Sequence, residues 1–165
     1  MERPAMICHW ESVESSDSPG YPDSPEHFSL GVPLGRMLGL TRLGIHHERL
    51  LPGRRTSYPH AESAEEEFIY VIEGTPDAWI NGQLYRLQPG DAVGFPAGTG
   101  ICHTFINNTQ ALVCLLVVGE ANKAENRIYY PLNPDYAATR TDRWLNPPEQ
   151  VFGSHDGKPS QKSKH

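Results

Sequence analysis

Cysteine is scarce in this sequence: only Cys8, Cys102 and Cys114 occur, and three cannot all pair within one chain. No CxxC motif is present. Reduced thiols in a cytoplasm are the simplest interpretation, so we expect a cytoplasmic protein. Cys102 and Cys114 lie in strand-like segments, where we expect small buried apolar side chains rather than reactive ones.

Long apolar segments and excess positive charge are also missing. The longest apolar run, residues 111–118, has eight residues, whereas a membrane helix needs about 20. The first ten residues contain no apolar stretch of signal-peptide length. Fourteen basic residues against twenty acidic ones give a formal charge of −6, a poor match for nucleic acid or an anionic lipid surface. We therefore expect neither a nucleic-acid nor a membrane partner.

The 165 residues suffice for one domain, and 38% of them are hydrophobic, enough for a buried core. Fifteen glycines and fifteen prolines indicate many turns. Residues 1–37 are rich in Ser, Pro and acids and predict an extended N-terminal arm. Residues 38–131 carry the strand patterns of the domain. Residues 132–165 predict a C-terminal extension with a disordered end.

Short strand-like segments follow one another through the central region. They cover residues 41–50, 67–74, 77–80, 83–87, 91–95, 103–108, 111–119 and 127–131. Asn81–Gly82 is a strong hairpin pattern between two of them. Segment 41–50 alternates, with Leu43, Ile45 and His47 on one face and Arg42, His46 and Glu48 on the other. Regular short strands with Gly/Pro turns predict an all-β sandwich or barrel.

Residues that can carry chemistry gather in two stretches, and the first is residues 53–74. His60 and Glu62 are two apart, so an extended chain directs both to the same side. Four residues then precede Glu67, and six more precede Gly74. This spacing resembles the first motif of the cupin superfamily. Glu62 stands where that motif expects a second histidine, and six residues rather than five separate Gly53 from His60.

The second stretch, residues 90–108, resembles the second cupin motif. Five residues separate Gly90 from Pro96, two separate Gly100 from His103, and three separate His103 from Asn107. The turn between Pro96 and Gly100 is two residues longer than the pattern, in a position where insertions are tolerated. The resemblance, with its neighbouring strands, extends over about residues 38–131.

The resemblance implies a cupin-type jelly-roll β-barrel that holds one divalent metal ion. By position, the ligand set would be His60, Glu62, Glu67 and His103. Imidazole and carboxylate suit Mn, Fe, Ni or Zn, and the sequence does not choose among them. Glu62 in place of an imidazole would bring the net charge of a divalent site from +1 to near 0, and so weaken its pull on anions. The alternative is that Glu62 belongs to a solvated acidic loop.

Other residues are candidates for the pocket wall, each with a plainer alternative. His47 is either a buried, hydrogen-bonded side chain or part of the pocket. Arg127 and Tyr129 lie near a strand end and either line the barrel mouth or sit on the surface. Asn107 belongs to the second motif. The Gly-Ser-His-Asp-Gly segment, residues 153–157, is a turn by composition, with a lid as the alternative.

Three classes of function remain open. The first is a metal-dependent enzyme acting on a small polar molecule, by oxygenase, isomerase or lyase chemistry. The second is a non-catalytic module that binds or senses a small ligand. The third is a structural dimer with a vestigial site. We also expect a homodimer, with the N-terminal arm contributing to the interface, because exposed sheet edges favour pairing.

Overall fold

Strands dominate the computed structural model of this chain, which describes residues 3–160 apart from residues 15, 18, 23 and 122. The elements in chain order are η1 (Trp10–Ser12), β1 (Leu30–Val32), α1 (Leu34–Met37), β2 (Leu43–Leu50), β3 (Ala61–Glu62), β4 (Glu67–Glu73), β5 (Asp77–Ile80), β6 (Gln83–Arg86), β7 (Ala92–Phe95), β8 (His103–Ile106), β9 (Val113–Glu120), β10 (Ile128–Tyr129) and α2 (Pro134–Thr139). The two α-helices are short, and no helix in the described part of the chain could span a membrane.

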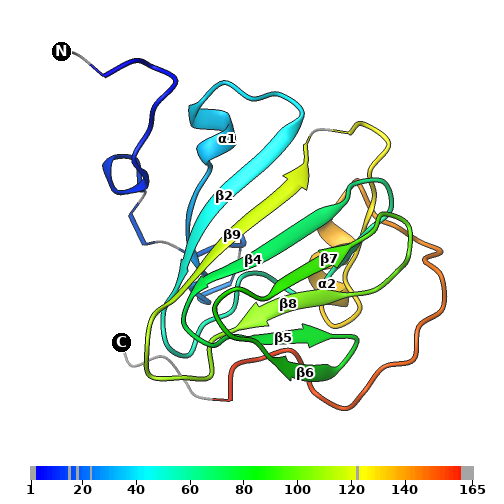
Figure 1. The fold of residues 1–165 in the computed structure, drawn as a ribbon. Coiled ribbons are helices and arrows are strands. Elements are labelled where there is room, and N and C mark those ends of the chain that lie inside the picture. Colours follow the sequence, from blue (N-terminus) through cyan, green and yellow to red (C-terminus); the bar gives the residue numbers. More distant parts are fainter. Residues whose placement is uncertain (1–2, 15, 18, 23, 122, 161–165) are drawn as a thin grey trace.

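The strands form two facing sheets, as Figure 1 shows. One sheet has the order β1-β2-β9-β4-β7, and the other has the order β6-β5-β8. A small β10-β3 pair adjoins the second sheet through the bridge between His60 and His103. All named strand pairs are antiparallel. This is the jelly-roll β-barrel that the sequence predicts.

Apolar side chains from both sheets fill one end of the barrel. The main cluster consists of Leu50, Ile69, Val71, Ala78, Phe95, Phe105, Val113 and Leu115. They come from β2, β4, β5, β7, β8 and β9, so burial of this cluster holds the two sheets together. Polar side chains on the same strands, among them Glu48, Glu67 and His103, line an interior cavity beside this cluster.

The five-stranded sheet decides which residues face inward. In its register Glu67 lies beside Gly119, and Glu48 lies beside Leu115. Leu115 is buried in the core, so strand alternation places Glu48 on the interior face. His47 therefore points outward, where its ring stacks on Trp10 with centroids 4.5 Å apart. The more apolar face of β2 is thus the outer one.

The predicted hairpin at Asn81–Gly82 is present. Both residues have positive φ, 45° and 82°, as the two central positions of a type I′ turn require. The turn joins β5 to β6, and Trp79 of β5 is fully buried beneath it. Residues 153–157 dock on this hairpin: Gly153 N–H donates to Asn81 O, and Trp79 Nε1 donates to His155 O.

The N-terminal segment packs on the barrel. Its last part contains β1, which pairs with β2, so the sheet begins within residues 1–37. Arg55 is almost completely buried and donates two hydrogen bonds to Glu26 and one to Gly157 O. One guanidinium thereby joins the N-terminal segment, the barrel and the C-terminal segment. The last five residues of the predicted disordered end lie outside the described residues.

Candidate metal centre

Backbone pairing places two imidazoles side by side on one wall of the barrel. His60 N–H donates to His103 O and His103 N–H donates to His60 O, at 3.2 and 2.9 Å. This bridge sets the two ring centroids 5.0 Å apart. His103 is the first residue of β8, and Glu67 is the first residue of β4 in the opposite sheet. The site therefore spans the interior between the sheets.

The side chains of His60, Glu67 and His103 converge. One ligand atom from each lies within 4.8 Å of the other two. His103 Nε2 and Glu67 Oε2 are hydrogen-bonded at 2.5 Å. The His103 ring stacks on Phe95, with centroids 3.6 Å apart and planes 8° apart, which fixes the ring plane. Three nitrogen and oxygen donors at this separation can bind a single cation.

His60 is prepared to act as a ligand through its second nitrogen. Its Nδ1–H donates to the backbone carbonyl of Tyr58 at 2.8 Å, and Ser57 Oγ lies 3.3 Å from the same nitrogen. This arrangement leaves Nε2 free, as in histidine ligands whose other nitrogen is held by a carbonyl. Burial, together with the neighbouring His103, lowers the pKa of His60 to about 4. The imidazole is thus neutral at pH 7, the form that binds a cation.

Glu67 is ionised at neutral pH despite its burial. Desolvation acts to raise the pKa of its carboxyl, but the hydrogen bond from His103 and the nearby histidines outweigh it and lower the pKa. Two imidazoles, each neutral when it binds a metal, and one carboxylate would leave a divalent ion with a net charge of about +1. The donor set fits a divalent metal ion.

An interior cavity of about 80 Å³ adjoins the three clustered side chains. Its wall also includes Glu48, Thr56, Ser57, Ile69, Phe105 and Val117. Since a water molecule occupies about 30 Å³ in the liquid, the cavity has room for an ion with one or two waters. A larger molecule would reach the ion with one end only.

Glu62 lies next to the cluster but is not one of its three members. It lines a small adjoining hollow together with Glu65, Glu67 and His103. Burial, then the negative charges of Glu67 and Glu65, raise the pKa of Glu62 to about 7. A carboxyl in this position could approach a bound ion as a fourth ligand or through a water, and this role stays a prediction.

None of the four candidate pocket residues is part of the wall of this cavity. His47 is on the outer face against Trp10. Asn107 is fully buried, and its amide donates to Leu50 O and Ala111 O, so it secures a turn. Arg127 donates to the carbonyls of Ala124 and Asn126 at the surface. Tyr129 packs beside the buried cluster around Trp79.

The sequence does not single out two residues beside the site, Glu48 and Phe95. In residues 41–50, Leu43, Ile45 and His47 form the more apolar face, and an apolar face is usually the buried one, so the pattern favours His47 over Glu48 as a pocket residue. The pattern His46-x-Glu48 was the available indication, because both residues share the face that turns out to be interior. Phe95 carried no indication, since its stacking on His103 depends on two strands from different sheets.

Fold and site together define a small jelly-roll barrel with an interior cluster of histidine and glutamate. Residues 46–119 match the family model of the cupin domain. These residues of the chain therefore form a cupin domain, as the two motifs indicate. No curated protein matches the chain.

Solved structures support the same assignment. A sugar phosphate isomerase of the cupin superfamily from Silicibacter pomeroyi is 34% identical, with a TM-score of 0.58, and 61% of this chain aligns with 63% of it. A candidate sugar phosphate isomerase from Acidithiobacillus ferrooxidans is 30% identical, with a TM-score of 0.59, and 62% of this chain aligns with 65% of it. In both comparisons the aligned region thus covers less than two thirds of this chain and less than two thirds of the solved structure.

A third structure resembles this chain in fold alone. The polyketide cyclase RemF from Streptomyces resistomycificus has a TM-score of 0.60, although it is only 20% identical. The alignment covers 86% of this chain and 95% of RemF. The same barrel therefore accounts for most of both chains.

Proposed function

We propose that this protein is a metal-dependent cupin enzyme that acts on a small polar molecule, with one divalent ion bound by His60, Glu67 and His103. The observation that carries the proposal is the convergence of these three side chains on an interior cavity. A bound ion would supply Lewis acidity, polarising a carbonyl or hydroxyl oxygen of the molecule. Two imidazoles and one carboxylate suit Mn, Fe, Ni or Zn.

Isomerisation of a carbonyl or hydroxyl compound is the reaction class we favour over oxygenase or lyase chemistry. The support is that two solved structures, 34% and 30% identical to this chain, are described as a sugar phosphate isomerase and a candidate sugar phosphate isomerase. The cavity wall contains no lysine or arginine among the described residues. A phosphate group would therefore have to bind outside this cavity, and we leave the substrate class at a small polar molecule.

A non-catalytic module that binds a small ligand is the second candidate. The cavity volume of about 80 Å³ favours it, because pockets that enclose whole organic ligands commonly measure about 300–1,000 Å³. An enzyme with this cavity would need a molecule that enters by one end. The two candidates share the metal site and differ in turnover.

Elemental analysis of protein purified without added metal tests the shared site. We expect about one divalent ion per chain in the wild type and its loss in His103→Ala, because one of three ligands is removed. His9→Ala is the control, since His9 lies on the exposed N-terminal segment. Circular dichroism verifies that each variant is folded. Full metal occupancy in a folded His103→Ala variant would refute the assignment.

A further inference from the structure

Glu48 is a carboxyl group inside the barrel that no motif assigns to a role. It lies on β2, facing the interior, and shares the wall of the 80 Å³ cavity with His60, Glu67 and His103. The small volume means that anything held beside the three ligand side chains is also close to Glu48. Strand register places Glu48 beside Leu115 and therefore deeper in the barrel than Glu67, which lies beside Gly119.

The contacts of Glu48 hold it in place without neutralising it. Ser29 Oγ donates to Glu48 Oε2 at 2.6 Å, and this is its one hydrogen bond within the described part of the chain. Oε1 has no hydrogen-bond partner among the described residues, and Glu48 is part of the cavity wall. The neighbouring cation, Arg49, points to the outer face and pairs with Glu14. Among the described residues, Glu48 thus has no basic partner of the kind that fixes a structural carboxylate in its ionised form.

The electrostatic surroundings allow Glu48 to hold or release a proton near neutral pH. Burial raises its pKa to about 7, the hydrogen bond from Ser29 opposes the rise, and the charge of Glu67 adds to it. The titratable groups that face Glu48 across the cavity are Glu67, His60 and His103. His46 shares its interior strand face. None of these is in hydrogen-bond contact with Glu48 in the structure.

We propose that Glu48 is the proton-transfer residue of the cavity, acting on the molecule held beside His60, Glu67 and His103. The inference rests on the metal-dependent function proposed above. Glu48 Oε1 accepts a proton from a hydroxyl of the molecule, the O–H bond breaks, and its electron pair stays on the oxygen. The same proton returns to the product, so the carboxylate is regenerated and no other reactant is needed. Ser29 keeps the carboxyl aimed at the cavity.

The first experiment follows the carboxyl groups of metal-free protein by ¹³C NMR during a pH titration. We expect Glu62 and Glu48 each to give a resonance with a midpoint near pH 7, and the one that is absent in Glu48→Gln belongs to Glu48. Ser29→Ala should move this midpoint to higher pH, because the hydrogen bond that favours the charged form is lost. Glu73→Gln, an exposed position at the end of β4, is the matched control and should leave the resonance unchanged. A Glu48 midpoint below pH 5 overturns the proposal.

The second experiment uses Co²⁺ alone as the probe and measures proton release at pH 7. The positive ion should drive Glu48 to its ionised form, so the wild type should release about half a proton more per bound cobalt than Glu48→Gln. Both should bind one cobalt, because Glu48 is not a ligand. Equal proton release, or loss of cobalt from Glu48→Gln, overturns the proposal. If the wild type binds no cobalt, the metal-dependent function fails, and the titration of metal-free protein still decides the protonation of Glu48.

Discussion

At the residue scale, Glu62 is the position where this chain departs from the usual cupin ligands. It lies beside Glu67 and His103 without joining their cluster, and its pKa is raised to about 7 by burial and by its acidic neighbours. A nearby cation would favour the ionised form of this carboxyl. If Glu62 binds the ion, its negative charge lowers the net charge of the loaded site by one unit.

Replacing Glu62 with histidine gives a direct prediction. If Glu62 ligates, Glu62→His raises the net charge of a divalent site from near 0 to +1, and a small anion such as azide should bind at least several-fold more tightly. Anion titrations of wild type and variant, each loaded with the same metal to the same occupancy, measure the effect. Glu73→Gln serves as a control for surface charge. Equal azide affinities would remove Glu62 from the ligands.

At the element scale, the C-terminal segment is held against the β5–β6 hairpin by a close backbone approach. A Cβ built on Gly153 would lie 2.4 Å from Gly82 O, a distance that side chains do not tolerate. Gly153 N–H also donates to Asn81 O at 2.7 Å. The composition of residues 153–157 predicts a turn, and the structure shows that this turn packs on the hairpin.

Gly153→Ala should therefore displace the segment and lower the free energy of unfolding by about 1–3 kcal/mol, the usual range for overpacking. Urea denaturation measures the loss, and limited proteolysis should cut the segment faster. Gly94→Ala is the matched control, because a Cβ there meets no atom within 4 Å. Unchanged stability and proteolysis in Gly153→Ala would show that the contact is unimportant for docking.

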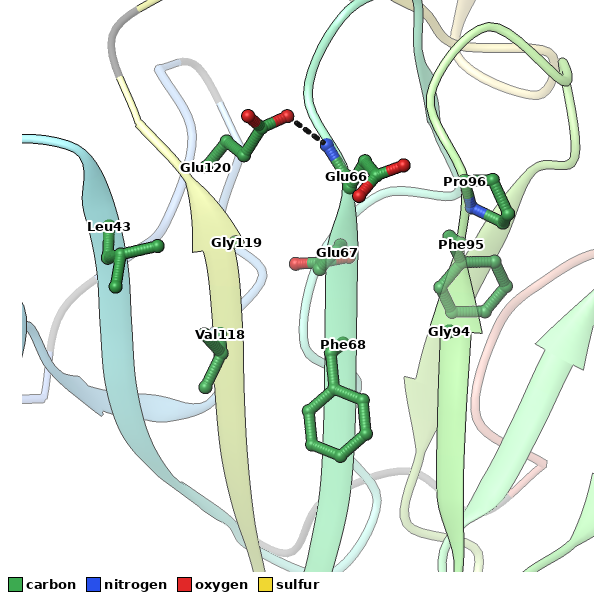
Figure 2. Close-up of a pocket in the computed structure, with 10 residues that line it drawn as sticks. All are labelled: Leu43, Glu66, Glu67, Phe68, Gly94, Phe95, Pro96, Val118, Gly119 and Glu120. Carbon is green, nitrogen blue, oxygen red and sulfur yellow. Dashed lines mark hydrogen bonds between the residues drawn. The ribbon is translucent and has the colours of Figure 1, made fainter.

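At the scale of the whole molecule, the outer face of the five-stranded sheet is unusually apolar for a surface. Phe68, Tyr70 and Ile72 of β4 are 44%, 39% and 45% exposed, and Leu43 of β2 is 45% exposed. Figure 2 shows Leu43, Val118 and Phe68 side by side on three neighbouring strands. A hollow of about 380 Å³ lies at this end of the face. Contiguous exposed apolar surface of this kind commonly marks a protein interface.

We predict that this face pairs with a second copy of the chain, since a two-fold axis lets one apolar patch cover itself. Tyr70→Glu should then convert a dimer to a monomer in light scattering at micromolar concentration. Tyr85→Glu, at an exposed tyrosine on the hairpin, should leave the dimer intact. A monomeric wild type contradicts the prediction. The contribution of the N-terminal segment to such an interface is a further prediction, tested by deleting residues 1–16.

The sequence by itself predicted the barrel and three residues, His60, Glu67 and His103, that the structure brings together. Turn residues such as Asn81–Gly82 act locally, through backbone conformations that few residues adopt, so they can be predicted without knowledge of the fold. The spacings around His60, Glu67 and His103 likewise lie within two short stretches of chain. Each stretch is recognisable alone, and the cupin resemblance joins them.

Only the tertiary structure decided which face of β2 is interior and what lies opposite the cluster. Alternation divides a strand into two faces but does not say which face points into the barrel. A sheet can carry apolar residues on its outer surface when another segment or another chain covers that surface. Trp10 covers His47 in this way, and Glu48 consequently faces the cavity. Glu48 comes close to Glu67, His60 and His103 because two sheets pack face to face. A local sequence pattern cannot predict this packing.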